Sequence, residues 1–297
     1  MVVMLNLAGS ARADYTPYFW GNTSGDWASP GTWANHWEPV PPGHHIPSPE
    51  ARYDGNGVPI QGYEDIAITI GGVTINVTTD GQGCVQLYQG YHVGVTTLNI
   101  AAGKHLQVTM TAQVGLGNDA SPEIATGILN VYGSFYCKKL FVPNSKTDTG
   151  IINIYAGGSV DVNEWGCDVG FADANAFDAT GTVNFKGGIM TIQGALVINL
   201  KGLINIEAGT LKVFGDVRTQ LQGYVDNGRI TSFGGVSPLC FPVVSFLDGY
   251  TYVKTRTCVT YLPADLNQDC YVDTLDFAMM AAHWLDCTEP TDSNCVQ

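Results

Sequence analysis

The chain has 297 residues, of which 36 are glycine and 13% are charged, and its 27 acidic against 13 basic side chains give a formal net charge of −14. This acidity argues against nucleic acid as a partner, because phosphate backbones require a basic protein surface. Low charge, 45% hydrophobic residues and many glycines are typical of an all-β protein with frequent turns, and exclude a disordered chain.

The first thirteen residues, MVVMLNLAGSARA, are similar to the end of a secretory signal peptide. A short apolar run is followed by Ala11-Arg12-Ala13, which has the small-x-small pattern of a cleavage site. We therefore expect a secreted protein, extracellular or on a cell surface, in a compartment where disulfides persist among its eight cysteines. No later stretch approaches the ~20 apolar residues of a transmembrane helix.

Residues 14–65 are rich in tryptophan, proline and glycine, and they include Trp20, Trp27, Trp33 and Trp37. One interpretation is a platform of aromatic rings on which sugars stack, which would make these four residues ligand-binding. The other is an N-terminal cap, since the first turn of a solenoid exposes a sheet edge and an open core that bulky rings can cover. We favour the cap.

Residues 66–235 contain a repeated unit centred on an apolar-Asn-apolar triplet. The asparagines of the five triplets are Asn99, Asn130, Asn153, Asn184 and Asn205, spaced by 31, 23, 31 and 21 residues. A turn of about 21 residues at ~3.3 Å each closes three short strands, as expected for a solenoid whose turns bury one another. Period-two alternation predicts that the apolar neighbours point inward and that the asparagines form a ladder outside.

The clearest repeat predicts strands at Thr182–Phe185, Ile189–Ile192 and Ala195–Ile198. Paired glycines at Gly157-Gly158 and Gly187-Gly188 are expected at corners that need a positive φ angle. The segment GTVNFKGG, after Val169-Gly170 and a loop, resembles the glycine-rich repeats of secreted bacterial surface and autotransporter passenger proteins. This resemblance implies a right-handed parallel β-helix, a three-sided all-β solenoid, for residues 66–235. It does not indicate an activity, because such folds include lyases, hydrolases, adhesins and inert spacers.

Residues 236–262 change pattern and predict a β-hairpin that caps or connects the solenoid. Its strands are expected at Val243–Leu247 and Tyr250–Val253, turning at Asp248-Gly249. Cys240 and Cys258 flank this unit, so we consider a disulfide between them.

Residues 263–297 carry the strongest site signal, a twelve-residue loop from Asp265 to Asp276. Oxygen-bearing side chains occupy positions 1, 3, 5, 9 and 12, and position 7 can offer its backbone carbonyl, as in an EF-hand. This spacing suits Ca²⁺, which prefers six to eight oxygen ligands. The residues 274–285 that follow predict a helix, and the alternative to calcium is an acidic cap on that helix.

This loop and helix are similar to a type I dockerin repeat. The resemblance implies Ca²⁺ as cofactor, a cohesin-like or surface protein as partner of residues 263–297, and the ligand set Asp265, Asn267, Asp269, Tyr271 (carbonyl), Asp273 and Asp276. Two features depart from the family. Cys270 stands where glycine usually permits the sharp turn, and a dockerin has two repeats where this chain shows one.

No catalytic residue is identified by a sequence motif. Asp161, Glu164 and Asp168 are considered as a group that converges with Glu207 on one face, which a polysaccharide lyase or glycoside hydrolase would require. The scattered acids and the few basic residues favour a non-catalytic protein. The expected function is a secreted β-helix with a calcium-binding tail for attachment or assembly. The alternative is a carbohydrate-binding or polysaccharide-degrading β-helix recruited through that tail.

Overall fold

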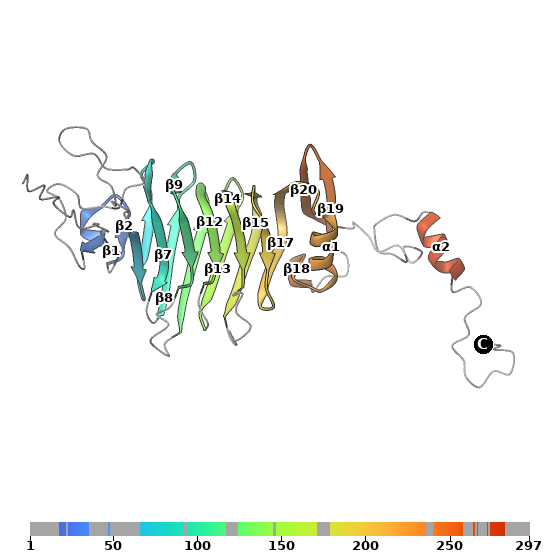
Figure 1. Cartoon of the computed structure of the whole chain (residues 1–297), viewed down its shortest axis with the longest axis horizontal. Helices are drawn as coiled ribbons and strands as arrows, with labels where there is room; N and C mark the ends of the chain where they lie inside the picture. The colour runs from blue at the N-terminus through green and yellow to red at the C-terminus, as the bar shows by residue number, and fades with distance from the viewer. Residues whose placement is uncertain are drawn as a thin grey trace, which may run out of the picture.

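The computed structural model describes residues 18–21, 23–35, 47, 66–91, 94–116, 124–144, 147–170, 179–235, 240–257, 264, 266, 272 and 274–282. Its strands form one continuous hydrogen-bonded sheet, in which most neighbours run parallel, and this sheet curls around a core along a rod (Figure 1). The architecture is all-β, with two α-helices among the described residues. It is compatible with the β-helix that the sequence predicts.

The strands pair in three columns, and the chain visits each column once before it moves to the next rung. The first column, called the asparagine face, contains β2 (Gly25–Asp26), β5 (Thr74–Val77), β8 (Gly94–Ile100), β11 (Ala125–Val131), β13 (Thr149–Tyr155), the first parts of β15 (Thr180–Ile192) and β17 (Gly202–Phe214), and β18 (Ile230–Thr231).

The second column, called the groove face, contains β6 (Gln82–Cys84), β9 (His105–Val108), the first parts of β12 (Ser134–Val142) and β14 (Ser159–Val169), and the second parts of β15 and β17. The third column contains β1 (Tyr18–Gly21), β4 (Ile66–Ile70), β7 (Gln86–Tyr91), β10 (Thr111–Val114), the second parts of β12 and β14, and β16 (Leu196–Ile198). At the N-terminal end, the 3-10 turn η1 (Pro30–Thr32) leads into β3 (Trp33–Asn35), which pairs antiparallel with β1.

The predicted strands of the clearest repeat are confirmed, with one difference. Two of them merge into the single long strand β15, which turns the corner at Gly187 with φ 125°, while the third is β16. The corner at Gly157 likewise has φ 80°. Its neighbour Gly158 is required for another reason, because a Cβ there would lie 2.2 Å from the carbonyl oxygen of Val131.

Alternation along the strands produces the core. Val183, Phe185, Ile204 and Ile206 are all 0% exposed, as their positions beside the asparagines predict. Each large apolar side chain buried in this way contributes ~1.5–3 kcal/mol to folding. The core also contains Cys84, Cys137 and Cys167, each 0% exposed, and burial raises the pKa of the Cys137 and Cys167 thiols.

The asparagine ladder is confirmed for Asn99, Asn130, Asn153 and Asn184, and it begins one rung earlier than predicted, at Asn76. Each amide donates to the oxygen of the asparagine on the rung before it: Asn99 to Asn76 at 2.8 Å, Asn130 to Asn99 at 2.8 Å, Asn153 to Asn130 at 2.9 Å and Asn184 to Asn153 at 3.0 Å. Asn205 is in register with Asn184, but its amide donates to Glu207 at 3.4 Å and not to Asn184, so its predicted place in the ladder is wrong. Its amide oxygen accepts instead from the backbone N–H of Gly234 at 2.7 Å.

The C-terminal end of the rod contains a helix that the repeat pattern did not predict. Helix α1 (Arg218–Asp226) follows β17 at the point where a strand of the third column would come, and it inserts Leu221 into the core at 0% exposure. Gln220 fixes the helix to β16, because its amide donates to the carbonyl oxygen of Leu196 at 2.8 Å. A 3-10 turn, η2 (Phe233–Gly235), follows β18.

The predicted hairpin is confirmed as β19 (Cys240–Leu247) and β20 (Tyr250–Thr257), turning at Asp248 (φ 50°) and Gly249 (φ 79°). β20 pairs antiparallel with β17 and so covers the last edge of the groove face. The predicted disulfide at Cys240 is wrong: Cys240 is free, and its sulfur lies 3.6 Å from Oγ1 of Thr257, directly opposite it. The last described element is α2 (Thr274–Ala282).

Candidate functional site

Of the six residues predicted to bind calcium, the structure describes Asp276, at the twelfth position of the loop. Asp276 lies in the first turn of α2, is 2% exposed, and accepts a hydrogen bond on Oδ1 from the backbone N–H of Leu266 at 2.7 Å. The end of the loop therefore returns to its beginning. The other five predicted ligands, Asp265, Asn267, Asp269, Tyr271 and Asp273, lie outside the described residues.

Helix α2 presents an apolar surface. Phe277 is 65% exposed, Met279 45% and Met280 39%. These three side chains are exposed to solvent.

The tryptophans of the N-terminal segment are found in the core where the structure describes them. Trp27 is 0% exposed and Trp33 7%, and their rings meet edge to face with centroids 4.8 Å apart. The indole N–H of Trp33 donates to the carbonyl oxygen of Trp27 at 2.8 Å. Buried rings offer no face for sugar stacking, so these two residues act as a cap. The side chain of Trp20 and all of Trp37 lie outside the described residues.

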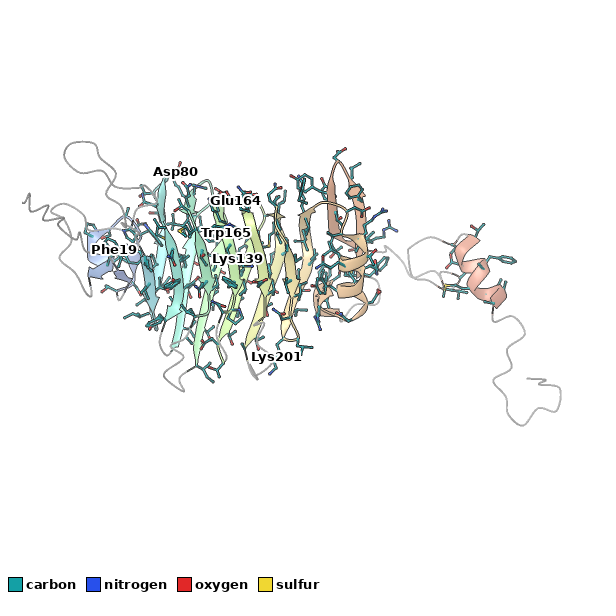
Figure 2. The ribbon with its side chains drawn as sticks, viewed as in Figure 1. Phe19, Asp80, Lys139, Glu164, Trp165 and Lys201 are labelled. Carbon is teal, nitrogen blue, oxygen red and sulfur yellow. The ribbon has the colours of Figure 1, made fainter. Side chains whose placement is uncertain are left out.

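The four carboxylates considered as a catalytic group do not share one site. Glu164 pairs with Lys138 at 3.1 Å, Asp168 pairs with Lys139 at 2.7 Å, and Glu207 accepts from the amide of Asn205 at 3.4 Å on a different face. Lys139 and Glu164 can be located in Figure 2. Each of these three acids has a separate partner, and the described residues contain no cluster of three or more His, Cys, Asp or Glu side chains.

Asp161 is the fourth carboxylate, and it lines a groove on the groove face. This groove has a volume of about 260 Å³ and is bounded by Tyr136, Asp161, Val162, Asn163, Thr191 and Gln193. The side chains come from three successive rungs, in β12, β14 and β15 and at their ends. The groove could not be predicted from the sequence, because its residues become neighbours only through the register of these rungs.

The surroundings of Asp161 raise its pKa. Desolvation by the neighbouring protein is the largest cause, and a hydrogen bond from Thr191 and the positive charges of His105 and Lys212 oppose it. The side chain nevertheless reaches solvent. Asp161 therefore presents an accessible carboxylate that can accept hydrogen bonds from a ligand.

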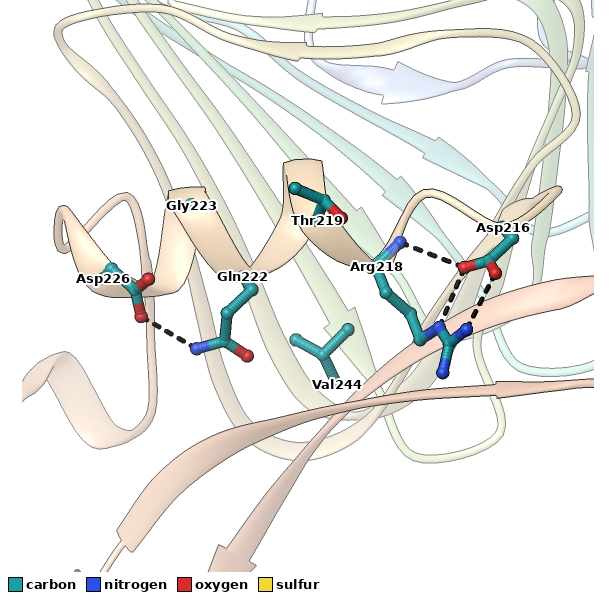
Figure 3. A pocket seen from close by; sticks show the side chains of 7 residues that line it. All are labelled: Asp216, Arg218, Thr219, Gln222, Gly223, Asp226 and Val244. Carbon is teal, nitrogen blue, oxygen red and sulfur yellow. Dashed lines mark hydrogen bonds and ion pairs between the residues drawn. The ribbon is translucent and has the colours of Figure 1, made fainter.

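A second depression of about 630 Å³ lies between α1 and β19 (Figure 3). Its charged groups satisfy one another: Arg218 donates to both carboxylate oxygens of Asp216 at 2.9 Å, and Gln222 donates to Asp226 at 2.8 Å. These bonds hold side chains in place at the start and at the end of the helix and so stabilise it. We regard it as structural.

Neither helix in the described part of the chain has the length and apolar character needed to span a membrane. Comparison of the chain with protein-family models, with curated proteins and with solved structures finds no match.

Proposed function

We propose that this protein is a secreted, non-catalytic, right-handed three-sided parallel β-helix that attaches to a partner through a calcium-dependent dockerin-like tail, residues 263–297. One observation carries the proposal. The carboxylate of Asp276 is 2% exposed and accepts a hydrogen bond from the backbone of Leu266, so the two ends of the acidic loop lie together. A closed loop with alternating oxygen side chains has the donor chemistry that Ca²⁺ requires.

Two further features support attachment as the role of the tail. The exposed apolar side chains of α2, Phe277, Met279 and Met280, are of the kind that a partner protein covers. The dispersed and paired carboxylates of the rod favour a scaffold over a glycosidase, which needs two carboxyl groups roughly 5–9.5 Å apart across a groove.

The test is calcium titration of the full-length protein by isothermal titration calorimetry, together with thermal unfolding in Ca²⁺ and in EGTA. We expect one Ca²⁺ per chain, a calcium-dependent stabilisation of the tail, and loss of both in Asp265→Ala and Asp276→Ala. Asp226→Ala removes an equal charge from α1 and should bind calcium normally. Equal calcium heats in all variants, or none at millimolar Ca²⁺ in the unaltered protein, would refute the site.

A further inference from the structure

The groove face carries a line of polar side chains that runs along the axis of the rod. Tyr136 is in register with Asp161, Asp161 with Thr191, and Thr191 with Lys212. Adjacent strands in a sheet are ≈4.7–4.9 Å apart, so these side chains follow one another at that interval. A ligand that contacts several of them must therefore be elongated along the rod.

Hydrogen-bonding groups in the groove remain available to a ligand. The amide of Asn163 donates to the phenol oxygen of Tyr136 at 3.3 Å, which leaves its second N–H and its carbonyl oxygen without a described partner. The phenol of Tyr136 keeps its own proton to donate, and the carboxylate of Asp161 accepts from Thr191 with acceptor capacity to spare. Donors and acceptors thus alternate within one groove.

The donors and acceptors of the groove favour some classes of ligand over others. Five of the six lining residues have polar side chains, which disfavours an apolar ligand. A single carboxylate is too few for a cation site. The chain's net charge of −14 disfavours a polyanion, and Lys212, the one cation in the described part of this line, lies 3.8 Å from the centroid of the Tyr250 ring. Sugar hydroxyls both donate and accept, which matches the groove.

We propose that the groove face binds a neutral, linear polysaccharide along the rod axis, with Tyr136, Asp161 and Asn163 as its central contacts. This site goes beyond attachment through the tail and does not depend on calcium. It also replaces Trp27 and Trp33 as candidate sugar contacts, since both are buried. Gln193 closes the groove on the side of the hairpin, because its amide and the phenol of Tyr250 bond to each other at 3.0 Å.

The experiment is calorimetric titration of the full-length protein with cellohexaose, xylohexaose, mannohexaose and laminarihexaose, with hexagalacturonate as the anionic comparison. EGTA is present throughout, so that failure of the calcium proposal cannot affect the result. We expect at least one neutral hexasaccharide to bind saturably, and more tightly than its disaccharide. Asn163→Ala and Tyr136→Phe should each weaken this binding, the first by about tenfold or more.

Thr182→Ala is the control, because Thr182 points outward on the asparagine face and should leave binding unchanged. Circular dichroism establishes that each variant is folded. No saturable binding of any neutral hexasaccharide would overturn the proposal, as would a preference for hexagalacturonate or full affinity in folded Asn163→Ala. Equal affinity for hexasaccharide and disaccharide would overturn the elongated mode of binding.

Discussion

The asparagine ladder makes a quantitative prediction that separates its interior from its ends. Asn130 takes part in two amide-to-amide bonds, donating to Asn99 at 2.8 Å and accepting from Asn153 at 2.9 Å, whereas Asn76 takes part in one. A hydrogen bond contributes a net ~1 kcal/mol to stability. The asparagines are half-buried, so partners left behind can reach water and the full desolvation penalty does not apply.

We therefore expect Asn130→Ala to lower the free energy of unfolding by about 2 kcal/mol and Asn76→Ala by about 1 kcal/mol. Asn184→Ala, at the other end of the ladder, should resemble Asn76→Ala because it also removes one bond. Since all three changes replace asparagine by alanine in a strand, the end positions serve as matched controls for strand propensity. Urea unfolding followed by circular dichroism measures the differences, with constant m-values as the check that the transition itself is unchanged.

Double variants sharpen the test. Asn130→Ala and Asn153→Ala each remove two bonds, but the double variant removes only three, because the bond between Asn153 and Asn130 is shared. The double variant should therefore lose about 1 kcal/mol less unfolding free energy than the sum of the two single variants. Asn99→Ala with Asn184→Ala shares no bond and should be additive. Equal losses of unfolding free energy in the end and interior variants would show that the ladder does not stabilise the rod. A loss below ~0.5 kcal/mol in an interior variant would show the same.

Three further predictions concern backbone crowding, burial and charge. Gly181→Ala should destabilise the protein by about 3 kcal/mol or more in urea unfolding, because the new Cβ would lie 1.8 Å from the carbonyl oxygen of Val142. Gly223→Ala, with nothing within 4 Å in helix α1, should be neutral or stabilise by about 0.5–1 kcal/mol, and similar effects of the two changes would contradict the packing. Iodoacetamide and mass spectrometry should label Cys240 in the native protein but Cys167 only after unfolding, and rapid native labelling of Cys167 would contradict its burial. The folded state raises the pKa of Asp161, so the folded protein binds more protons at this carboxyl than the unfolded chain does. The contribution of Asp161 to stability therefore falls as the pH rises from the pKa of the unfolded chain through the pKa of the folded protein. Asp161→Asn should therefore have a higher thermal unfolding midpoint than the unaltered protein at neutral pH, and the same midpoint in acid below both pKa values. A difference between the two midpoints that does not change with pH would contradict the raised pKa of Asp161.

Sequence patterns predicted the core and the ladder because both depend on local alternation. Val183, Asn184 and Phe185 are adjacent in the chain, so a period of two places their side chains without knowledge of any other rung. The hairpin was predictable for the same reason, since Asp248-Gly249 supplies the positive φ angles of a tight turn by itself.

The groove was not predictable, because it depends on register between rungs. Tyr136, Asp161 and Thr191 follow the asparagines of their own rungs by six, eight and seven residues. These offsets differ because the corners contain bulges, such as the register shift between Phe185 and Ile189. A constant offset would have shown the line of polar residues in the sequence.

Helix α1 was missed for a different reason. Its sequence, RTQLQGYVD, is mostly polar and contains Gly223, so neither propensity nor a continuous apolar stripe marks it as a helix. Leu221 is its one fully buried residue. Tertiary packing on the end of the core therefore selects the helix, which no local pattern can show.

The two ends of the rod favour the division of roles proposed here. A parallel sheet leaves a strand with unpaired backbone N–H and C=O groups at each end, and these groups can pair with a second chain. In the described residues, β3 pairs antiparallel at the first end, while β20 pairs antiparallel with β17 and α1 covers the core at the last. These pairings cover the first edge of the third column and the last edge of the groove face, which disfavours end-to-end association of rods through those two columns. We expect contact with partners at the polar groups of the groove and at the exposed apolar side chains of α2.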